Sequence, residues 1–171
     1  MNSLELIRDF VNTADLERGE DALADADGLQ GWLASQRLAE RGGRASEGDA
    51  KAARLVREAL RELLRANNAI EVDRDAATRT LDTAARRSGL TARFVDGSVA
   101  FVPSRPGGIG TLLAVVASSM SDGSWSRLKA CRSDSCRYAF VDTARNRSRQ
   151  WCDMAVCGNR EKARTFRERH A

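Results

Sequence analysis

Four cysteines stand close together in the last third of this 171-residue chain. They form two C-x4-C pairs separated by fifteen residues, and they are Cys131, Cys136, Cys152 and Cys157. Two similar pairs with a short spacer are typical of one tetrahedral zinc site, because thiolates suit a d10 ion that has no redox chemistry. We therefore expect one structural Zn2+ per chain, since four protein ligands leave no open position for a reactive water.

Two disulfides, an iron–sulfur cluster and four unrelated buried thiols are the alternative interpretations of these cysteines. Residues 1–10 are amphipathic and unlike the apolar core of a signal peptide, so we expect a cytoplasmic protein, in which thiols stay reduced. The spacing also matches neither common ferredoxin pattern. A segment of 45 residues, from 127 to 171, buries too little surface to fold alone, and zinc binding would supply the missing free energy.

The segment that carries the cysteines is strongly basic. Residues 127–171 hold 12 Lys and Arg against 5 Asp and Glu, whereas the other 126 residues hold 16 against 19. Because four thiolates on Zn2+ sum to only −2, cations remain in excess, and such asymmetry is typical of a segment that meets a polyanion. The candidate nucleic-acid contacts are Arg145, Arg147, Arg149, Arg160, Lys162, Arg164, Arg167 and Arg169.

A final helix is predicted after the last cysteine, with Asn159 as its N-terminal cap. One face of this helix carries Arg160, Arg164 and Arg167. Another face carries Ala163, Phe166 and His170. We expect the second face to pack on the zinc core, so that the first presents guanidinium groups to phosphates and guanine edges.

The body that must position this module reads as mostly helical. Apolar residues recur at helical spacing near residues 4–11, 29–33, 52–63 and 107–120, and a further helix is predicted at about 74–88. Asp27 and Gln30 resemble a capping box for the second helix, and Ser46 and Asp49 open the longest one.

One β-hairpin interrupts the helical pattern near residues 91–102. Asp96-Gly97 between two β-prone runs predicts a two-residue turn that places Phe94 opposite Val99 and Ala92 opposite Phe101. We expect the phenylalanine face to lie on the helices, because a lone two-stranded ribbon is marginal in water. The predicted class is therefore mostly helical α+β, with a helical domain and hairpin at 1–126 and a small four-cysteine zinc-finger module at 127–171.

The run from residue 131 to 169 resembles the CGNR zinc-finger family, which is named for the tetrapeptide found here at 157–160. Further matches are the F-x-D at 140–142, the W-C-x-M at 151–154 and the K-A at 162–163. Such modules usually follow a domain called ABATE, and the F-V-N-T run at 10–13 with Trp32 is similar to the N-terminal signature of that domain. The resemblance covers the whole chain and implies a stress-induced transcription regulator.

No side-chain constellation in the sequence is typical of an active site. The one histidine, His170, is the penultimate residue, so Ser–His or Cys–His catalysis lacks a convincing base. The glycine-rich residues 106–110 lack the Gly-Lys-Ser/Thr ending of a Walker loop and are predicted to form a strand-to-helix turn. We expect a binding protein and not an enzyme. Polar residues after the first helix, Asn12 and Thr13, are with Trp32 the candidates for a ligand pocket.

The residues and the resemblance together predict a bacterial transcription regulator that binds DNA through the basic zinc module. The helical domain would sense a small-molecule effector or form a homodimer, because one module of this size buries only about 600–1,000 Å2 on DNA. The alternative is a zinc-stabilised interaction protein whose arginines bind RNA or an acidic protein surface. No apolar run approaches the length of a membrane span, so no membrane partner is expected.

Overall fold

A computed structural model of the chain describes residues 3–40 and 42–170. The helices are α1 (Ser3–Val11), α2 (Ala26–Ser35), α3 (Glu47–Asn67), α4 (Arg74–Arg87), α5 (Gly108–Ser121) and α6 (Asn159–Arg169). A 3-10 turn, η1 (Ser124–Arg127), and a π-helical turn, η2 (Met154–Gly158), lie in the C-terminal part. The strands pair as antiparallel ribbons: β1 (Ala14–Asp15) with β2 (Glu20–Asp21), β3 (Thr91–Val95) with β4 (Ser98–Val102), and β5 (Leu128–Ala130) with β6 (Ala139–Val141). The predicted mostly helical α+β class is confirmed.

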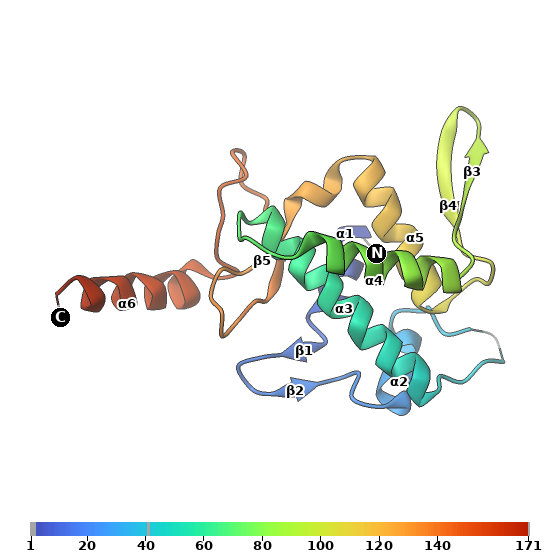
Figure 1. Cartoon of the computed structure of the whole chain (residues 1–171), viewed down its shortest axis with the longest axis horizontal. Coiled ribbons are helices and arrows are strands. Elements are labelled where there is room, and N and C mark those ends of the chain that lie inside the picture. Colours follow the sequence, from blue (N-terminus) through green and yellow to red (C-terminus); the bar gives the residue numbers. More distant parts are fainter. Residues whose placement is uncertain (1–2, 41, 171) are drawn as a thin grey trace.

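One apolar core joins the helices to the ribbon β5–β6. Its fully buried members include Ile7 and Phe10 of α1, Leu60 and Leu64 of α3, Leu112 of α5, and Leu128 and Ala130 of β5. The helix α3 crosses the middle of the body and reaches from α2 to β5 (Figure 1). The first strands of the cysteine-rich segment are therefore part of the main core and do not hang from it on a linker.

The start of α3 matches the sequence prediction. Ser46 and Asp49 form a capping box, in which Ser46 Oγ accepts the Asp49 N–H at 3.2 Å and Asp49 Oδ2 accepts the Ser46 N–H at 2.9 Å. This reciprocal pair satisfies two backbone donors that a helix start would otherwise leave open. The start of the longest helix is thus fixed by four consecutive residues.

The start of α2 differs from the sequence prediction. The capping residue is Asp25, whose extended backbone lets Oδ1 accept the Gly28 N–H at 2.8 Å. Asp27 already lies inside the helix, where its carboxylate cannot reach an N–H three residues on. The amide oxygen of Gln30 instead accepts the N–H of Ala45 at 2.9 Å and ties the loop before α3 to α2.

Two arginines of α3 are buried because they hold the loop between α1 and α2. Arg57 binds Asp21 through two parallel hydrogen bonds of 2.6 and 2.8 Å, which lower the pKa of Asp21. Arg61 donates to the carbonyl oxygens of Val11 at 2.6 Å and of Ala14 at 3.2 Å, where α1 ends. Charge-assisted bonds of this kind are strong, and they fix the acidic β1–β2 loop against the body.

The predicted helices near residues 74–88 and 107–120 are present as α4 and α5. Gly89 follows the last turn of α4 with a φ of +57°, as a C-terminal glycine should. One face of the nearly all-apolar α5 is buried in the core, with Leu112 and Leu113 among its residues. Within residues 3–40 and 42–170, no helix combines the length and the apolar character that crossing a bilayer requires.

The hairpin β3–β4 has the predicted register but not the predicted packing. Phe94 pairs with Val99 and Ala92 with Phe101 around a turn at Asp96-Gly97. The expectation that its phenylalanine face lies on the helices is wrong, because the side chain of Phe94 is 85% exposed. The ribbon projects from the body, and only the C-terminal end of β4 contacts α5 (Figure 1). Since α5 begins shortly after β4 ends, α5 can cover only the C-terminal end of β4.

Candidate metal centre

The first cysteine pair lies in the turn that joins β5 to β6. The N–H of Cys131 donates to Tyr138 O at 2.9 Å and closes the ribbon beyond its last strand pair. Inside the turn, the N–H groups of Cys136 and Arg137 both donate to Ser133 O at 3.0 Å. Arg137 takes a left-handed backbone conformation with a φ of +50°, which reverses the chain within this short span. The tight turn brings both thiols to the same place.

The second pair is positioned by the π-helical turn η2. Asp153 starts this turn, because its Oδ1 accepts the Val156 N–H at 3.0 Å and its carbonyl accepts the Gly158 N–H at 3.1 Å. Trp151 and Met154 pack closely over the backbone at Gly158. A Cβ at that position would lie 2.5 Å from Met154 Sδ and 3.1 Å from Trp151 Cδ1. Glycine is therefore the residue that lets this turn pack tightly beside the last cysteine.

The four thiol sulfurs form one cluster that fits a single zinc ion. All of them lie within 4.8 Å of one another, and the Sγ atom of Cys152 is 3.6 Å from that of Cys136 and 3.7 Å from that of Cys157. Sulfurs at the corners of a tetrahedron with Zn–S bonds of about 2.3 Å would be about 3.8 Å apart. A disulfide would need about 2.0 Å, and all four cysteines are free thiols. The structural zinc site predicted from the spacing is confirmed, with one ion per chain.

Hydrogen bonds within the cluster change how easily each thiol loses its proton. Bonds from Cys136 and Cys152 lower the pKa of Cys131, and the same contacts with Cys131 raise the pKa of Cys136 and the pKa of Cys152. Burial raises the pKa of Cys157. Zinc binds thiolates and so must displace the protons that remain, which makes zinc affinity fall as the pH falls.

A buried ion pair organises the chain between the two cysteine pairs. The Asp142 side chain is fully buried and accepts hydrogen bonds from Lys129 Nζ at 2.8 Å and from the N–H groups of Ala144 and Arg149 at 3.0 Å. Lys129 Nζ also donates to the carbonyls of Arg147 at 2.5 Å and Arg149 at 3.1 Å. Burial acts to raise the pKa of Asp142, but these bonds and the Lys129 charge outweigh it and hold the pKa below its usual value. No sequence pattern marks Lys129, and the F-x-D motif at 140–142 is the one signal of this ion pair in the sequence.

Three residues expected to line a ligand pocket lie together where α1 meets its neighbours. The side-chain amide of Asn12 donates to Ala139 O at 2.9 Å and accepts the Ala139 N–H at 2.7 Å, which fastens α1 to β6. The Thr13 hydroxyl donates to Phe10 O at 2.7 Å. Trp32 packs on Phe10 with ring centroids 5.0 Å apart. In this arrangement Asn12 joins the helical body to the zinc ribbon.

Replacing Asn12 with alanine is expected to destabilise the protein by about 1–3 kcal/mol, because the buried N–H and C=O of Ala139 lose their partners together. Urea unfolding of the zinc-loaded chain measures this effect. The stability of Asn12→Asp should fall between those of the wild type and Asn12→Ala, since a carboxylate accepts the Ala139 N–H but cannot donate to the Ala139 carbonyl. An unchanged unfolding midpoint for Asn12→Ala would show that the two hydrogen bonds do not contribute to stability.

A second joint connects the end of α3 to the zinc module. Asn67 donates to Leu128 O at 2.9 Å. Asn68 is 4% exposed, and its Nδ2 donates to the carbonyls of Ala130 and Gln150, both at 2.8 Å. Because these two carbonyls precede the first and second cysteine pairs, one asparagine holds both halves of the metal site against the body.

The basic residues of the loop at 143–150 differ in how far they are used inside the protein. Arg149 donates to Cys152 O at 2.9 Å and its guanidinium lies 5.1 Å from the centre of the Phe140 ring. Arg147 donates to Ser126 Oγ at 3.0 Å. Arg145 is exposed, and its side chain has no hydrogen-bond or ion-pair partner within the described chain. Of these three arginines, Arg145 is the one left free for an external anion.

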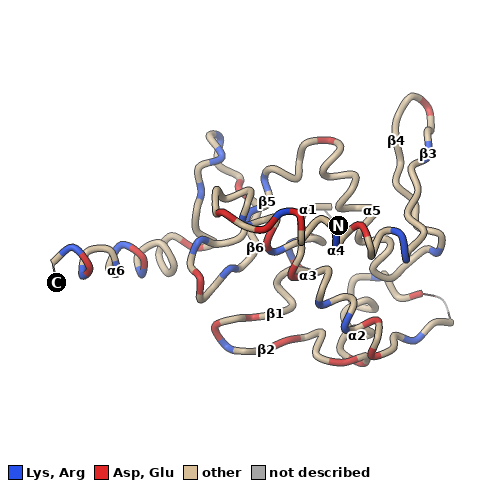
Figure 2. Tube along the Cα trace, in the orientation of Figure 1, with Lys and Arg blue, Asp and Glu red and all other residues tan. Residues whose placement is uncertain are grey.

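The basic residues of α6 are also unequal. Arg160 forms an ion pair with Glu17 in the β1–β2 loop. Arg164 binds Glu161 and Glu168, each at 2.8 Å, and Arg167 donates to the carbonyl of Ala163 at 3.3 Å. Among the basic side chains of α6, Lys162 and Arg169 have no polar partner within the described residues. Figure 2 shows these blue and red positions alternating along the helix.

The expected packing of α6 on the zinc core is wrong. Within α6, all of whose residues the structure describes, none is buried, and Phe166 is 63% exposed and stacks on His170 instead. Asn159 does not cap the helix either, because η2 runs directly into α6 and Asn159 already has helical backbone angles. The direction of η2 sends α6 away from the body, as an arm (Figure 1).

Two family models match the sequence. The ABATE model, described as "Putative stress-induced transcription regulator", matches residues 4–122. The CGNR zinc finger model matches residues 127–170. Both resemblances inferred from the sequence are thereby confirmed. No protein among curated sequences matches the chain.

The structure gives each residue of the C-G-N-R tetrapeptide a physical task. Cys157 contributes one thiol to the cluster, and Gly158 allows the close contact with Met154. Asn159 Nδ2 donates to a carbonyl of η2 at 3.1 Å. Arg160 reaches across to Glu17 and so links the metal module to the N-terminal loop.

Proposed function

The chain belongs to the ABATE family and carries a CGNR zinc finger, and from this premise we propose that it regulates transcription in the bacterial cytoplasm by binding DNA through the zinc module. The observation that carries the proposal is the placement of unused cations. The loop at 143–150 and α6 lie at the same end of the molecule, opposite the β3–β4 ribbon (Figures 1 and 2). The zinc cluster and the buried ion pair of Lys129 and Asp142 hold the base of both segments in place.

The shape of α6 supports insertion into a DNA groove. A helix with its side chains is about 10–12 Å across, and the major groove is about 12 Å wide. Since α6 buries none of its residues, it can enter a groove without leaving a core contact behind. Its internal ion pairs around Arg164 stabilise the helix, while Lys162 and Arg169 are available to phosphates.

The helical body is proposed to sense an effector or to form a homodimer. One zinc module buries only about 600–1,000 Å2 on DNA, which is small for a specific site. Two copies joined through their bodies would present two modules to two half-sites. The joints made by Asn12 and Asn68 support this role, because they would pass a movement of α1 or α3 directly to the metal ribbon.

Neutralising the unpaired cations is expected to weaken DNA binding and its salt dependence. For Arg145→Gln, Lys162→Gln and Arg169→Gln, each lost phosphate contact should reduce the slope of log K against log salt by about 0.9. Fluorescence anisotropy of the zinc-loaded protein with labelled duplex fragments measures both quantities. The matched control is Arg164→Gln, which should change them less because two glutamates already neutralise Arg164.

Two outcomes would contradict DNA binding. One is an absence of duplex binding by the zinc-loaded protein at low salt, and the other is an Arg164→Gln defect as large as that of Arg169→Gln. Arginine-rich faces also suit RNA and acidic proteins. Pull-down after digestion with DNase or with RNase separates these partners, because a nucleic-acid-dependent complex disappears only with the matching enzyme.

A further inference from the structure

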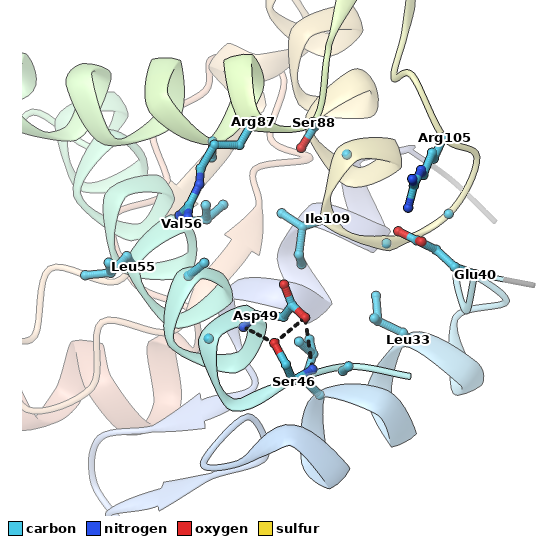
Figure 3. Close-up of a pocket in the computed structure, with 18 of the residues that line it drawn as sticks. Leu33, Glu40, Ser46, Asp49, Leu55, Val56, Arg87, Ser88, Arg105 and Ile109 are labelled. Carbon is cyan, nitrogen blue, oxygen red and sulfur yellow. Dashed lines mark hydrogen bonds between the residues drawn. The ribbon is translucent and has the colours of Figure 1, made fainter. Parts of the chain in front are cut away.

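A large cavity lies in the helical body, at the end away from α6. Its volume is about 1280 Å3, and it is bounded by α2, the loop at 43–46, α3, α4 and the first turn of α5 (Figure 3). The described residues that line it do not include Asn12, Thr13 or Trp32. Clefts with an apolar floor and a few polar groups are where proteins bind small molecules.

The floor of the cavity is apolar. Leu29, Leu33 and Val56 line it with side chains that also belong to the main core. Ile109 points into it from α5 (Figure 3). Leu55 also lines it but is 56% exposed, although most leucines in this protein are buried. A bound molecule with an apolar body would cover Leu55, so the floor favours a ligand that is not uniformly polar.

The rim of the cavity carries an excess of positive charge. Arg79, Arg87 and Arg105 line it, and none of their side chains has a hydrogen bond or an ion pair within residues 3–40 and 42–170. A fourth lining arginine, Arg44, is already paired with Asp27 at 2.8 Å.

The carboxylates that face these arginines are Glu40 and Asp49. Asp49 is engaged in the α3 capping box, where the hydrogen bonds from Ser46 lower its pKa and the charge of Arg87 adds to the effect. Three free arginines against these two groups leave a site that attracts anions.

The start of α5 also borders the cavity, and Glu40 occupies part of it. The first turn of α5 has no side-chain cap, but a Cβ on Gly108 would lie 2.8 Å from Glu40 Oε1, so this carboxylate already faces the positive helix end. Gly107 and Gly108 have φ values of +102° and +58°, and the Gly108 N–H donates to Leu38 O at 2.6 Å. A Cβ on Gly107 would lie 2.9 Å from Leu38 O, and this contact together with the two positive φ values explains the glycines at the start of α5.

We propose that this cavity binds a small amphiphilic anion. The apolar body of the ligand lies on the floor beside Val56, and its carboxylate or phosphate group meets Arg87, which lies next to Val56 at the rim (Figure 3). This ligand site does not depend on DNA binding. It rests on the proposed function in one respect, which is that the ligand would be the effector of the helical body. The cavity is far from the zinc ligands in the fold and shares no residue with them.

Four probes with one aromatic body test the proposal on the full zinc-loaded chain: 2-naphthoate, 2-naphthyl phosphate, 2-naphthalenemethanol and 2-naphthylmethylammonium. Titration calorimetry should show that at least one anion binds about tenfold or more tightly than the alcohol, and that the ammonium binds most weakly. The two anions separate a carboxylate ligand from a phosphate ligand, and a preference for either one supports the proposal.

Variants divide the binding into its polar and apolar parts. Arg87→Gln should reduce the preference for the anion over the alcohol by about tenfold. Arg105→Gln should reduce it less, because Arg105 lies on the other side of the opening (Figure 3). Leu55→Ser should weaken both probes alike and leave that preference unchanged. The matched control is Arg86→Gln, because Arg86 is exposed on the same helix but does not line the cavity.

The proposal is overturned if no probe binds at millimolar concentration, if the alcohol binds as tightly as both anions, or if Arg86→Gln acts as strongly as Arg87→Gln. The titrations contain no nucleic acid. Failure here therefore leaves a positive DNA-binding result standing, and failure of DNA binding leaves a positive titration standing.

Discussion

Replacing Cys157 with serine is expected to abolish stable zinc binding and to unfold the chain from the β5–β6 turn to the end of α6. A serine hydroxyl stays protonated at neutral pH, so only three thiolates would remain for the ion. Zinc binding supplies on the order of 10–16 kcal/mol in small zinc modules, and it does so only when the ligand set is complete. Metal analysis after dialysis against a chelator should give one zinc per wild-type chain and close to none for the variant.

The unfolding should extend into the body but not through it. Leu128 and Ala130 belong to the main core and Asn68 holds both halves of the metal site, so the ends of α1 and α3 should lose amide-exchange protection. The region around α2 and α4 has its own contacts and should keep its protection. Met154→Leu serves as the control, because this side chain lies in η2 but carries no ligand. Zinc retention by Cys157→Ser equal to that of wild type would contradict a four-cysteine site.

Lowering the pH should release zinc from the wild-type chain, as the Cys157→Ser substitution does. Protons compete with the ion for the thiolates, and the pKa values of Cys136, Cys152 and Cys157 are raised within the cluster. Stability that depends on the metal is therefore fully present near neutral pH and is lost as the pH falls.

The features that the sequence predicted correctly are those set by local chemistry. Cysteine spacing specifies a zinc site because ligand geometry allows few alternatives. The capping box at Ser46 and the hairpin turn at Asp96-Gly97 depend on a few consecutive residues, and both are found with the expected partners. Helical periodicity likewise located α4 and α5.

The features that the sequence missed depend on contacts between distant segments. Nothing local to Phe94 shows whether a helix will lie over it, and α5 covers only the base of the ribbon. The direction of α6 depends on η2, a π-helical turn that periodicity does not detect. The ligand pocket predicted at Asn12, Thr13 and Trp32 stays a prediction, and the partner that the structure shows for Asn12 is Ala139, 127 residues away. A polar residue at a helix end looks the same whether it binds a ligand or a backbone.

Replacing Asp142 with asparagine is expected to destabilise the protein by about 3–5 kcal/mol, although the side chain keeps its shape. The variant leaves the Lys129 ammonium, 7% exposed, without the negative charge that compensates it. Urea unfolding of the zinc-loaded chain measures the loss. Adding Lys129→Met should recover part of it, because the double variant has no uncompensated buried charge but also lacks the Lys129 bonds to the carbonyls of Arg147 and Arg149. Equal stabilities for the single and double variants would contradict the assignment.

The pH at which the unfolding of Asp142→Asn is measured decides whether the result reports the ion pair or the loss of zinc. The pKa of Asp142 in the folded chain lies below its usual value, so the pair contributes fully above the unfolded value of 3.8 and is lost only as the pH falls below it. The thiolates of Cys136, Cys152 and Cys157, whose pKa values are raised, take up protons before that point. The pair must therefore be studied near neutral pH, where both the metal and the carboxylate are in place.

Asp142→Asn also separates electrostatics from positioning at the proposed DNA surface. Removing an anion from a basic module should by charge alone strengthen its binding to phosphate. We expect the opposite, weaker binding of duplex DNA, because Asp142 accepts the backbone N–H groups of Ala144 and Arg149 and so orders the loop that presents Arg145. Stronger binding by the variant would show that the order of this loop does not matter for DNA contact.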